Sequence, residues 1–166
     1  EKELNDIIVD GPAGIRIIPA ASGVSELANL NKQELGGLVQ AFNEIKFDAD
    51  ILIVDTAPGV SHDVMTFSRA ANEIIVTICN DPASLVDAYA LIKILHNEYN
   101  INKFHIVANM VNSSSEGLEL FSKILLAADR FLNVLLVYSG CIPYDIFMKK
   151  SAQQRTALVH AYPASP

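Results

Sequence analysis

ILIVDTAPG, at residues 51–59, is the stretch that decides the fold class of this 166-residue sequence. Its first four residues are apolar, and similar short runs rich in β-branched residues recur at residues 74–78, 104–108 and 134–138. Runs this short and this uniformly apolar are typical of strands that are buried on both faces of a parallel sheet. They predict four strands, of which residues 51–54 are the first.

Helix signals occupy the segments between these runs. Asp81 followed by Pro82 predicts a helix that starts with a capping residue and a first-turn proline. Asn31 and Ser113 each stand three residues before a glutamate, which is the pattern of a capping box at a helix start. Strands that alternate with helices predict an α/β fold, with a mostly parallel sheet and helices on both faces.

The beginning of the sequence departs from this pattern. Apolar runs at residues 7–9 and 15–18 flank the sequence Gly-Pro-Ala-Gly at residues 11–14, which predicts either a hairpin or a strand reached by a tight turn. No internal repeat or low-complexity linker interrupts the sequence. We therefore expect one domain over residues 1–166.

Composition disfavours several classes of protein. With 12 Lys and Arg against 19 Asp and Glu, the net charge is −7, so the surface as a whole repels nucleic acid and anionic lipid. No apolar run approaches the ~18 residues of a membrane-spanning helix. Cys79 and Cys141 have apolar neighbours and no metal-binding spacing, so we expect buried free thiols in a cytoplasmic protein.

The residues that follow each apolar run are the candidates for a site, because ligands of open α/β sheets bind beyond the carboxyl ends of the strands. Asp55 follows four apolar residues, which is the Walker B form. A carboxylate there is costly to desolvate unless a cation such as hydrated Mg²⁺ meets it. Gly59 is placed to present its backbone N–H to a terminal phosphate. The alternative is that Asp55 caps the following turn.

Two further positions suit the base of a nucleotide. Asn109 follows the third run, and its amide offers a donor and an acceptor to a purine edge, although a turn residue is the alternative. Pro143 lies in the segment Ile-Pro-Tyr-Asp at residues 142–145, which would line a base or ribose. The same segment is equally good as a helix start with Asp145 as the cap.

Other reactive side chains form no recognisable site. Ser61, His62 and Asp63 are consecutive, so they point in different directions and cannot form a hydrogen-bonded relay. The four histidines lack metal-ligand spacing. We expect them to be surface or packing residues.

Taken in order, four segments resemble the MinD/ParA class of deviant Walker ATPases, and within it the flagellar number regulators of the FlhG (FleN) type. They are IIVDGPAGIRIIPAASG at residues 7–23, DTAPG at 55–59, DAYALIK at 87–93 and IPYD at 142–145. The resemblance implies a P-loop NTPase fold and a cytoplasmic ATPase that forms a homodimer around Mg·ATP. It also implies control of flagellum number and placement, with a flagellar FlhF-type GTPase and a flagellar transcriptional activator as partners.

The resemblance also implies roles for single residues. Asp55 matches the Walker B carboxylate that holds magnesium through water. Gly59 matches the switch II glycine near the γ-phosphate. Asn109 matches the asparagine that reads adenine, and Pro143 lies in the loop that lines the base.

The sequence departs from the family in what it lacks. It contains no K-G-G-x-G-K-T loop, no strand to carry that loop, and no amphipathic membrane-targeting helix after Pro166. We therefore expect the later part of an ATPase, which alone binds ATP poorly and does not hydrolyse it. Peripheral placement at the inner membrane or the cell pole is expected only through that helix in the full-length protein.

Three alternatives stay open at this point. A ParA-like partitioning ATPase would need clustered surface cations, which a net charge of −7 argues against. A non-catalytic α/β interaction module would use the same loops only as structure. A flavodoxin-like mononucleotide binder would need a phosphate-binding loop after its first strand, and none is found.

Overall fold

A computed structural model of the chain describes residues 7–19, 36–37, 40–42 and 49–165. The chain divides into two compact units, Glu1–Ala57 with His62–Ala70, and Pro58–Ser61 with Ala71–Pro166. The helix expected after Asn31 falls mostly outside the described residues.

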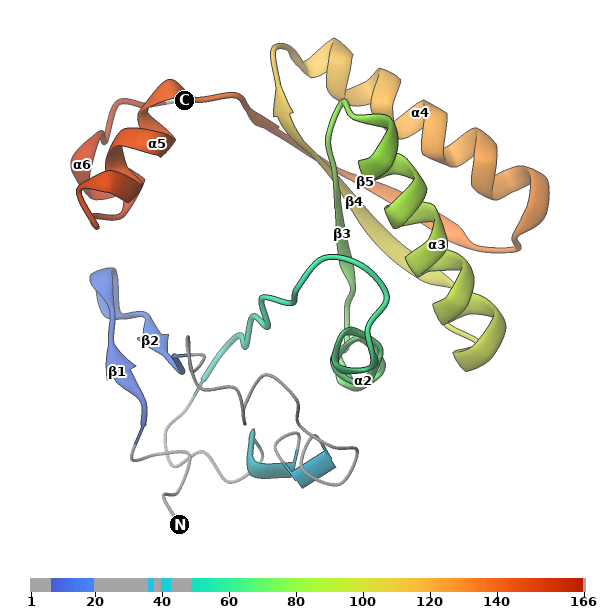
Figure 1. Cartoon of the computed structure of the whole chain (residues 1–166), viewed down its shortest axis with the longest axis horizontal. Helices are drawn as coiled ribbons and strands as arrows, with labels where there is room; N and C mark the ends of the chain where they lie inside the picture. The colour runs from blue at the N-terminus through green and yellow to red at the C-terminus, as the bar shows by residue number, and fades with distance from the viewer. Residues whose placement is uncertain (1–6, 20–35, 38–39, 43–48, 166) are drawn as a thin grey trace. The chain divides into compact units, whose positions relative to one another are not determined.

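The second unit contains a parallel sheet of three strands, which confirms the predicted α/β class (Figure 1). The strands are β3 (Ile75–Ile78), β4 (Lys103–Val111) and β5 (Leu135–Pro143), and β4 lies in the middle. Helix α3 (Pro82–Tyr99) connects β3 to β4, and α4 (Ser114–Phe131) connects β4 to β5. Both helices begin where predicted. Ser113 Oγ accepts a hydrogen bond of 3.2 Å from the backbone N–H of Glu116, whereas Asp81 occupies the N-cap position of α3 without a side-chain cap hydrogen bond.

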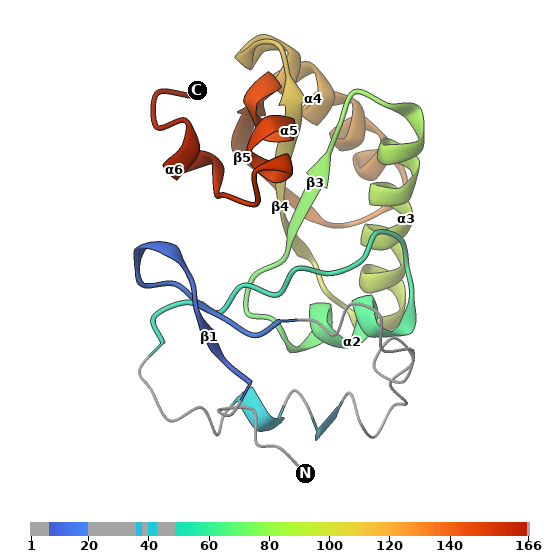
Figure 2. The same ribbon diagram turned by 60° about the vertical axis from the view of Figure 1, so that its left-hand side comes forward.

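The core of this unit lies between the sheet and these two helices. Both α3 and α4 contact the sheet and each other, and they lie on the same side of it (Figure 2). The side chains that point to the helices are buried: Phe104, Ile106 and Ala108 from β4, Ile92 and Leu95 from α3, and Leu120, Ile124 and Ala128 from α4. Burial of these apolar side chains is the main stabilising contribution to the unit.

The strands are covered less completely than the sequence predicts. Burial alternates along β3, where Val76 and Ile78 are buried whereas Ile75 is 65% exposed. The expected burial on both faces is therefore not met within this unit, because α3 and α4 share one face. Uniformly apolar strands do not by themselves reveal how many of their faces a helix covers.

The prediction of a first strand at residues 51–54 is wrong. Residues 51–54 form no strand, and their side chains are 40% to 84% exposed. A strand needs a neighbouring backbone to complete its hydrogen bonds. No strand in the described part of the chain pairs with residues 51–54, so their apolar character alone is not sufficient.

The hairpin at the beginning of the chain is confirmed. Strand β1 (Val9–Asp10) pairs antiparallel with β2 (Arg16–Ile17). The turn between them is the short helix η2 (Pro12–Gly14), and Gly14 adopts a φ of +80° that favours glycine. Helix α2 (His62–Ala70) follows later in the chain.

The end of the chain forms two short helices, α5 (Ile146–Gln153) and α6 (Leu158–Ala161). Asp145 caps α5, because its Oδ1 accepts a hydrogen bond of 2.7 Å from the N–H of Phe147. The Phe147 ring stacks on Tyr162 with 4.5 Å between centroids, which holds α5 against the last residues. Among the described residues, none of the helices is both long enough and apolar enough to cross a membrane.

Both cysteines are free thiols, as predicted. The expected burial is wrong, because Cys79 and Cys141 are each only partly buried. Both lie near the carboxyl ends of strands, where the apolar core gives way to polar side chains.

Candidate functional site

The candidate site is the carboxyl edge of the sheet, where the ends of β3, β4 and β5 lie side by side. In the parallel register Ile78 lies opposite Ala108, Asn109 opposite Ile142, and Val111 opposite Pro143. The strands β4 and β5 extend further than predicted, so Asn109 and Pro143 belong to strand ends and not to the loops that follow.

Asn109 is half-buried and sits in an irregular part of β4. The register shifts between Asn109 and Val111, and Met110 adopts a left-handed φ of +58°. Such a bulge redirects the side chains around it. The Oδ1 of Asn109 accepts a hydrogen bond of 3.0 Å from the N–H of Met110, so the NH₂ donors are the part of the amide that this bond leaves for other contacts.

Pro143 is the last residue of β5, and the backbone fixes it beside β4. The N–H of Tyr144 donates a hydrogen bond of 2.8 Å to the carbonyl oxygen of Val111. The structure thus brings Asn109 and Pro143 together at one edge. Asp145 is a helix cap, in agreement with the alternative interpretation of this segment.

Asp55 and Gly59 belong to different units of the chain. Asp55 is exposed and belongs to the first unit, whereas Gly59 belongs to the second. Gly59 has a φ of +96°, and an added Cβ would meet no atom within 4 Å, so backbone conformation and not space favours glycine there. That open backbone suits an approach by a phosphate group.

The described residues offer few ligands to the magnesium ion that the resemblance implies. Within the described residues, no three His, Cys, Asp or Glu side chains converge as a metal site. Asp55 is a single exposed carboxylate. That fits a Mg²⁺ that keeps most of its water and takes one or two carboxylates, and it does not fit a cage built only from protein ligands.

The sequence predicts only a capping-box role for Glu116. In the structure its carboxylate also has partners outside that motif. Its Oε2 accepts hydrogen bonds from the backbone N–H of Asn112 at 2.7 Å and from Asn112 Nδ2 at 3.0 Å. Its Oε1 accepts a hydrogen bond of 2.8 Å from Asn80 Nδ2. These bonds lower the pKa of Glu116 below its ordinary value of 4.5, the backbone N–H of Asn112 having the largest effect.

Gly117, the next residue of α4, permits close packing at this edge. A Cβ there would lie 2.6 Å from the hydroxyl oxygen of Tyr138 and 2.9 Å from the Cβ of Cys141. Both neighbours belong to β5. Glycine therefore allows the first turn of α4 to approach the strand that carries Pro143.

A second polar cluster, also missed from the sequence, joins β4 and β5 to Glu73. Lys103 Nζ lies 3.0 Å from both carboxylate oxygens of Glu73, and His105 Nε2 lies 3.0 Å from Oε2. His105 Nδ1 lies 3.0 Å from Ser139 Oγ. Lys103, followed by His105, lowers the pKa of Glu73. The cluster bridges neighbouring strands, so His105 is not an isolated surface residue.

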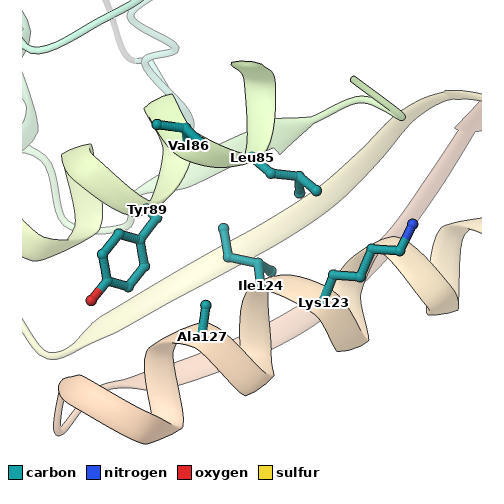
Figure 3. Close-up of a pocket in the computed structure, with 6 residues that line it drawn as sticks. All are labelled: Leu85, Val86, Tyr89, Lys123, Ile124 and Ala127. Carbon is teal, nitrogen blue, oxygen red and sulfur yellow. The ribbon is translucent and has the colours of Figure 1, made fainter. Parts of the chain in front are cut away.

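An apolar groove runs between α3 and α4, which are in contact, and contains none of the predicted site residues. Figure 3 shows side chains of both helices directed toward the space between them. The lining residues are Leu85, Val86 and Tyr89 from α3, and Lys123, Ile124 and Ala127 from α4. Nothing in this lining resembles a nucleotide site.

A sheet of parallel strands joined by helices, with polar side chains at its carboxyl edge, is an open α/β architecture, and such sheets bind ligands at that edge. The chain is 44% identical over 163 residues to the antiactivator FleN of Pseudomonas aeruginosa, covering 98% of the chain and 58% of FleN. It is 29% identical over 161 residues to the flagellum site-determining protein YlxH of Helicobacter pylori, covering 95% of the chain and 53% of YlxH.

A third relative comes from an archaeon. The chain is 27% identical over 164 residues to an uncharacterised ATP-binding protein of Methanocaldococcus jannaschii, covering 99% of the chain and 58% of that protein. No protein-family model matches the chain. The resemblance to FleN is confirmed, since the chain is homologous to FleN over nearly its whole length, and this homology is consistent with a MinD/ParA-like ATPase of the FlhG type. It spans 53% to 58% of the length of these relatives.

Proposed function

We propose that this chain is part of a MinD-like ATPase that regulates the number and placement of flagella. The observation that carries the proposal is the 44% identity to an antiactivator, FleN, over 98% of the chain. The flagellar role is further supported by the relative that is named as a flagellum site-determining protein. The ATPase role is supported by the relative that is named as ATP-binding. In this proposal residues 1–166 form part of one ATPase domain.

ATP is the proposed ligand, and the carboxyl edge of the sheet is its base side. The Asn109 amide donates to the adenine ring, and Pro143 covers the base from the neighbouring strand. This assignment is supported by the register that sets Asn109 opposite Ile142, the residue before Pro143. The residue types fit, because a side-chain amide discriminates purine edges and a proline offers an apolar surface.

The phosphate side is assigned to Asp55 and Gly59. Magnesium, when bound, neutralises phosphate charge and orients the terminal phosphate. Asp55 holds it through water, and the backbone N–H of Gly59 donates to the terminal phosphate. The sequence of 166 residues contains no Walker A motif, so ATP binding and hydrolysis are proposed for the full-length protein.

The proposed switch is a homodimer that forms in the ATP state and separates after slow hydrolysis. Its proposed partners are a flagellar FlhF-type GTPase and a flagellar transcriptional activator. Nucleic acid is not a proposed ligand, since the net charge of the sequence is −7. The protein acts in the cytoplasm, and it reaches the inner membrane or the pole through a helix outside these 166 residues.

Two experiments test this proposal. Light scattering measures the oligomeric state of the full-length protein with ATP and with ADP, and flagella are counted in a strain that lacks the gene. A dimer only with ATP and an altered flagellum number are expected. A protein that binds no ATP would instead support the non-catalytic interaction module. A normal flagellum number in the deletion strain would contradict the regulatory role.

A further inference from the structure

Glu116 connects two strand ends that are distant in sequence. It lies half-buried in the first turn of α4 and accepts hydrogen bonds from Asn112, at the end of β4, and from Asn80, after β3. Both of its carboxylate oxygens are engaged, with donor to acceptor distances of 2.7 to 3.0 Å. Hydrogen bonds to an ionised carboxylate are stronger than bonds between neutral groups.

This arrangement differs from an ordinary capping box. In that motif the glutamate accepts a hydrogen bond from the backbone N–H of the N-cap residue. Ser113 is the N-cap of α4, yet Glu116 binds the residue before it and also reaches across to Asn80. The side chain therefore does more than cap the start of the helix, because it fixes the ends of two adjacent strands.

The segment between Asn109 and Asn112 is the part that this contact holds. Met110 within it has a left-handed φ of +58°, which is uncommon for a residue other than glycine. Backbone of this kind persists when its surroundings constrain it from several sides. The β5 ladder constrains Asn109 and Val111, and Glu116 constrains Asn112.

We propose that Glu116 is a positioning residue for base recognition, which acts by holding the Asn109–Asn112 segment so that the Asn109 amide faces the base. The inference rests on the proposed function of this edge as the adenine side of a nucleotide site. Glu116 does not touch the nucleotide in this account. It acts through Asn112 on the strand end that carries Asn109, and it anchors that end to β3 through Asn80.

The test measures base preference and not affinity alone. The full-length protein is titrated calorimetrically with ATP, GTP and inorganic triphosphate. Glu116→Ala is expected to weaken ATP binding about fivefold, the size of effect expected when a contact acts through another residue. Triphosphate binding is expected to stay unchanged, so the preference for ATP over GTP falls.

Two further variants test the hydrogen bonds themselves. In Glu116→Gln the amide oxygen still accepts hydrogen bonds from Asn112. If the side-chain amide of Asn80 rotates by half a turn, its oxygen accepts a hydrogen bond from the new NH₂ group. The preference of this variant for ATP over GTP is therefore expected to stay near that of the wild type. Asn80→Ala removes a single hydrogen bond and is expected to lose part of the preference. It also provides the test if Glu116→Ala does not fold.

Ser113→Ala is the matched control, because it removes the cap bond to the Glu116 N–H and leaves the hydrogen bonds of the Glu116 carboxylate to Asn112 and Asn80 in place. It is expected to lower stability without changing base preference. An equal loss of preference in Ser113→Ala, or an unchanged preference in Glu116→Ala, would overturn the positioning role. If the wild-type protein binds ATP no better than triphosphate, the nucleotide site itself is overturned, and the positioning role with it.

Discussion

Asn109 on β4 lies opposite Ile142 on β5 in the parallel ladder, at the carboxyl edge of the sheet. This pairing places the predicted adenine-reading amide beside the strand end that carries Pro143. The neighbouring bond from Tyr144 to Val111, at 2.8 Å, fixes the two strand ends together. The geometry of this edge is therefore set by the backbone ladder and not by loops.

Asp55→Ala in the full-length protein is expected to abolish ATP hydrolysis and to weaken the ATP-dependent dimer. Removing the carboxylate leaves the hydrated magnesium ion without its anchor. A phosphate-release assay measures the loss. If Asp55 is only a turn cap, the variant would lose about 1 kcal/mol of stability and keep its turnover, and that result would refute the metal role.

Gly117→Ala is expected to lower the free energy of unfolding by about 1–3 kcal/mol. Alanine favours the helix by up to about 1 kcal/mol, but its Cβ would lie 2.9 Å from the Cβ of Cys141. The steric cost exceeds the gain, since α4 must move away from β5. Urea unfolding measures the change, with Ser122→Ala on the exposed side of α4 as the control. A stabilised Gly117→Ala protein would show that α4 does not pack this closely.

Glu116→Gln should alter the pH dependence of stability. The pKa of Glu116 is lowered from 4.5 in the folded protein, so its ionised form stabilises the fold above that pH. The contribution is lost as pH falls from the ordinary carboxyl range through the lower folded value. The stability advantage of wild type over the variant is therefore expected to be constant near neutral pH and to shrink below pH 4.5.

Urea unfolding of both proteins from pH 7 downward gives this difference at each pH. Glu73 also has a lowered pKa, but it is present in both proteins, so its effect cancels in the comparison. A difference that grows as the pH falls would contradict the depressed pKa of Glu116.

Local signals in the sequence predicted much of the fold. Pro82 after Asp81, and the cap at Ser113, mark helix starts that the structure confirms, because capping depends on neighbouring residues. The apolar runs at residues 104–108 and 134–138 likewise lie within or largely within strands. Residues 51–54 have the same character and form no strand, since pairing depends on a neighbour that the run itself does not specify.

The candidate site was harder to predict from the sequence than the fold. Asn109 and Pro143 were predicted at the correct edge, but their place inside β4 and β5 depends on the register of the ladder. The bond from Asn80 to Glu116 spans 36 positions and exists only because β3 and β4 are adjacent. A glutamate at the third position of a helix suggests a cap and gives no sign of such a partner.

The proposed role of the carboxyl edge of the sheet is to read adenine through Asn109. Its most direct test is a calorimetric titration of the full-length protein and its Asn109→Ala variant with Mg·ATP and with inorganic triphosphate. The variant loses one or two hydrogen bonds worth about 0.5–1.5 kcal/mol each. If Asn109 reads the base, ATP affinity falls about tenfold while triphosphate affinity is unchanged. Equal weakening of both ligands, or no weakening of either, would contradict it.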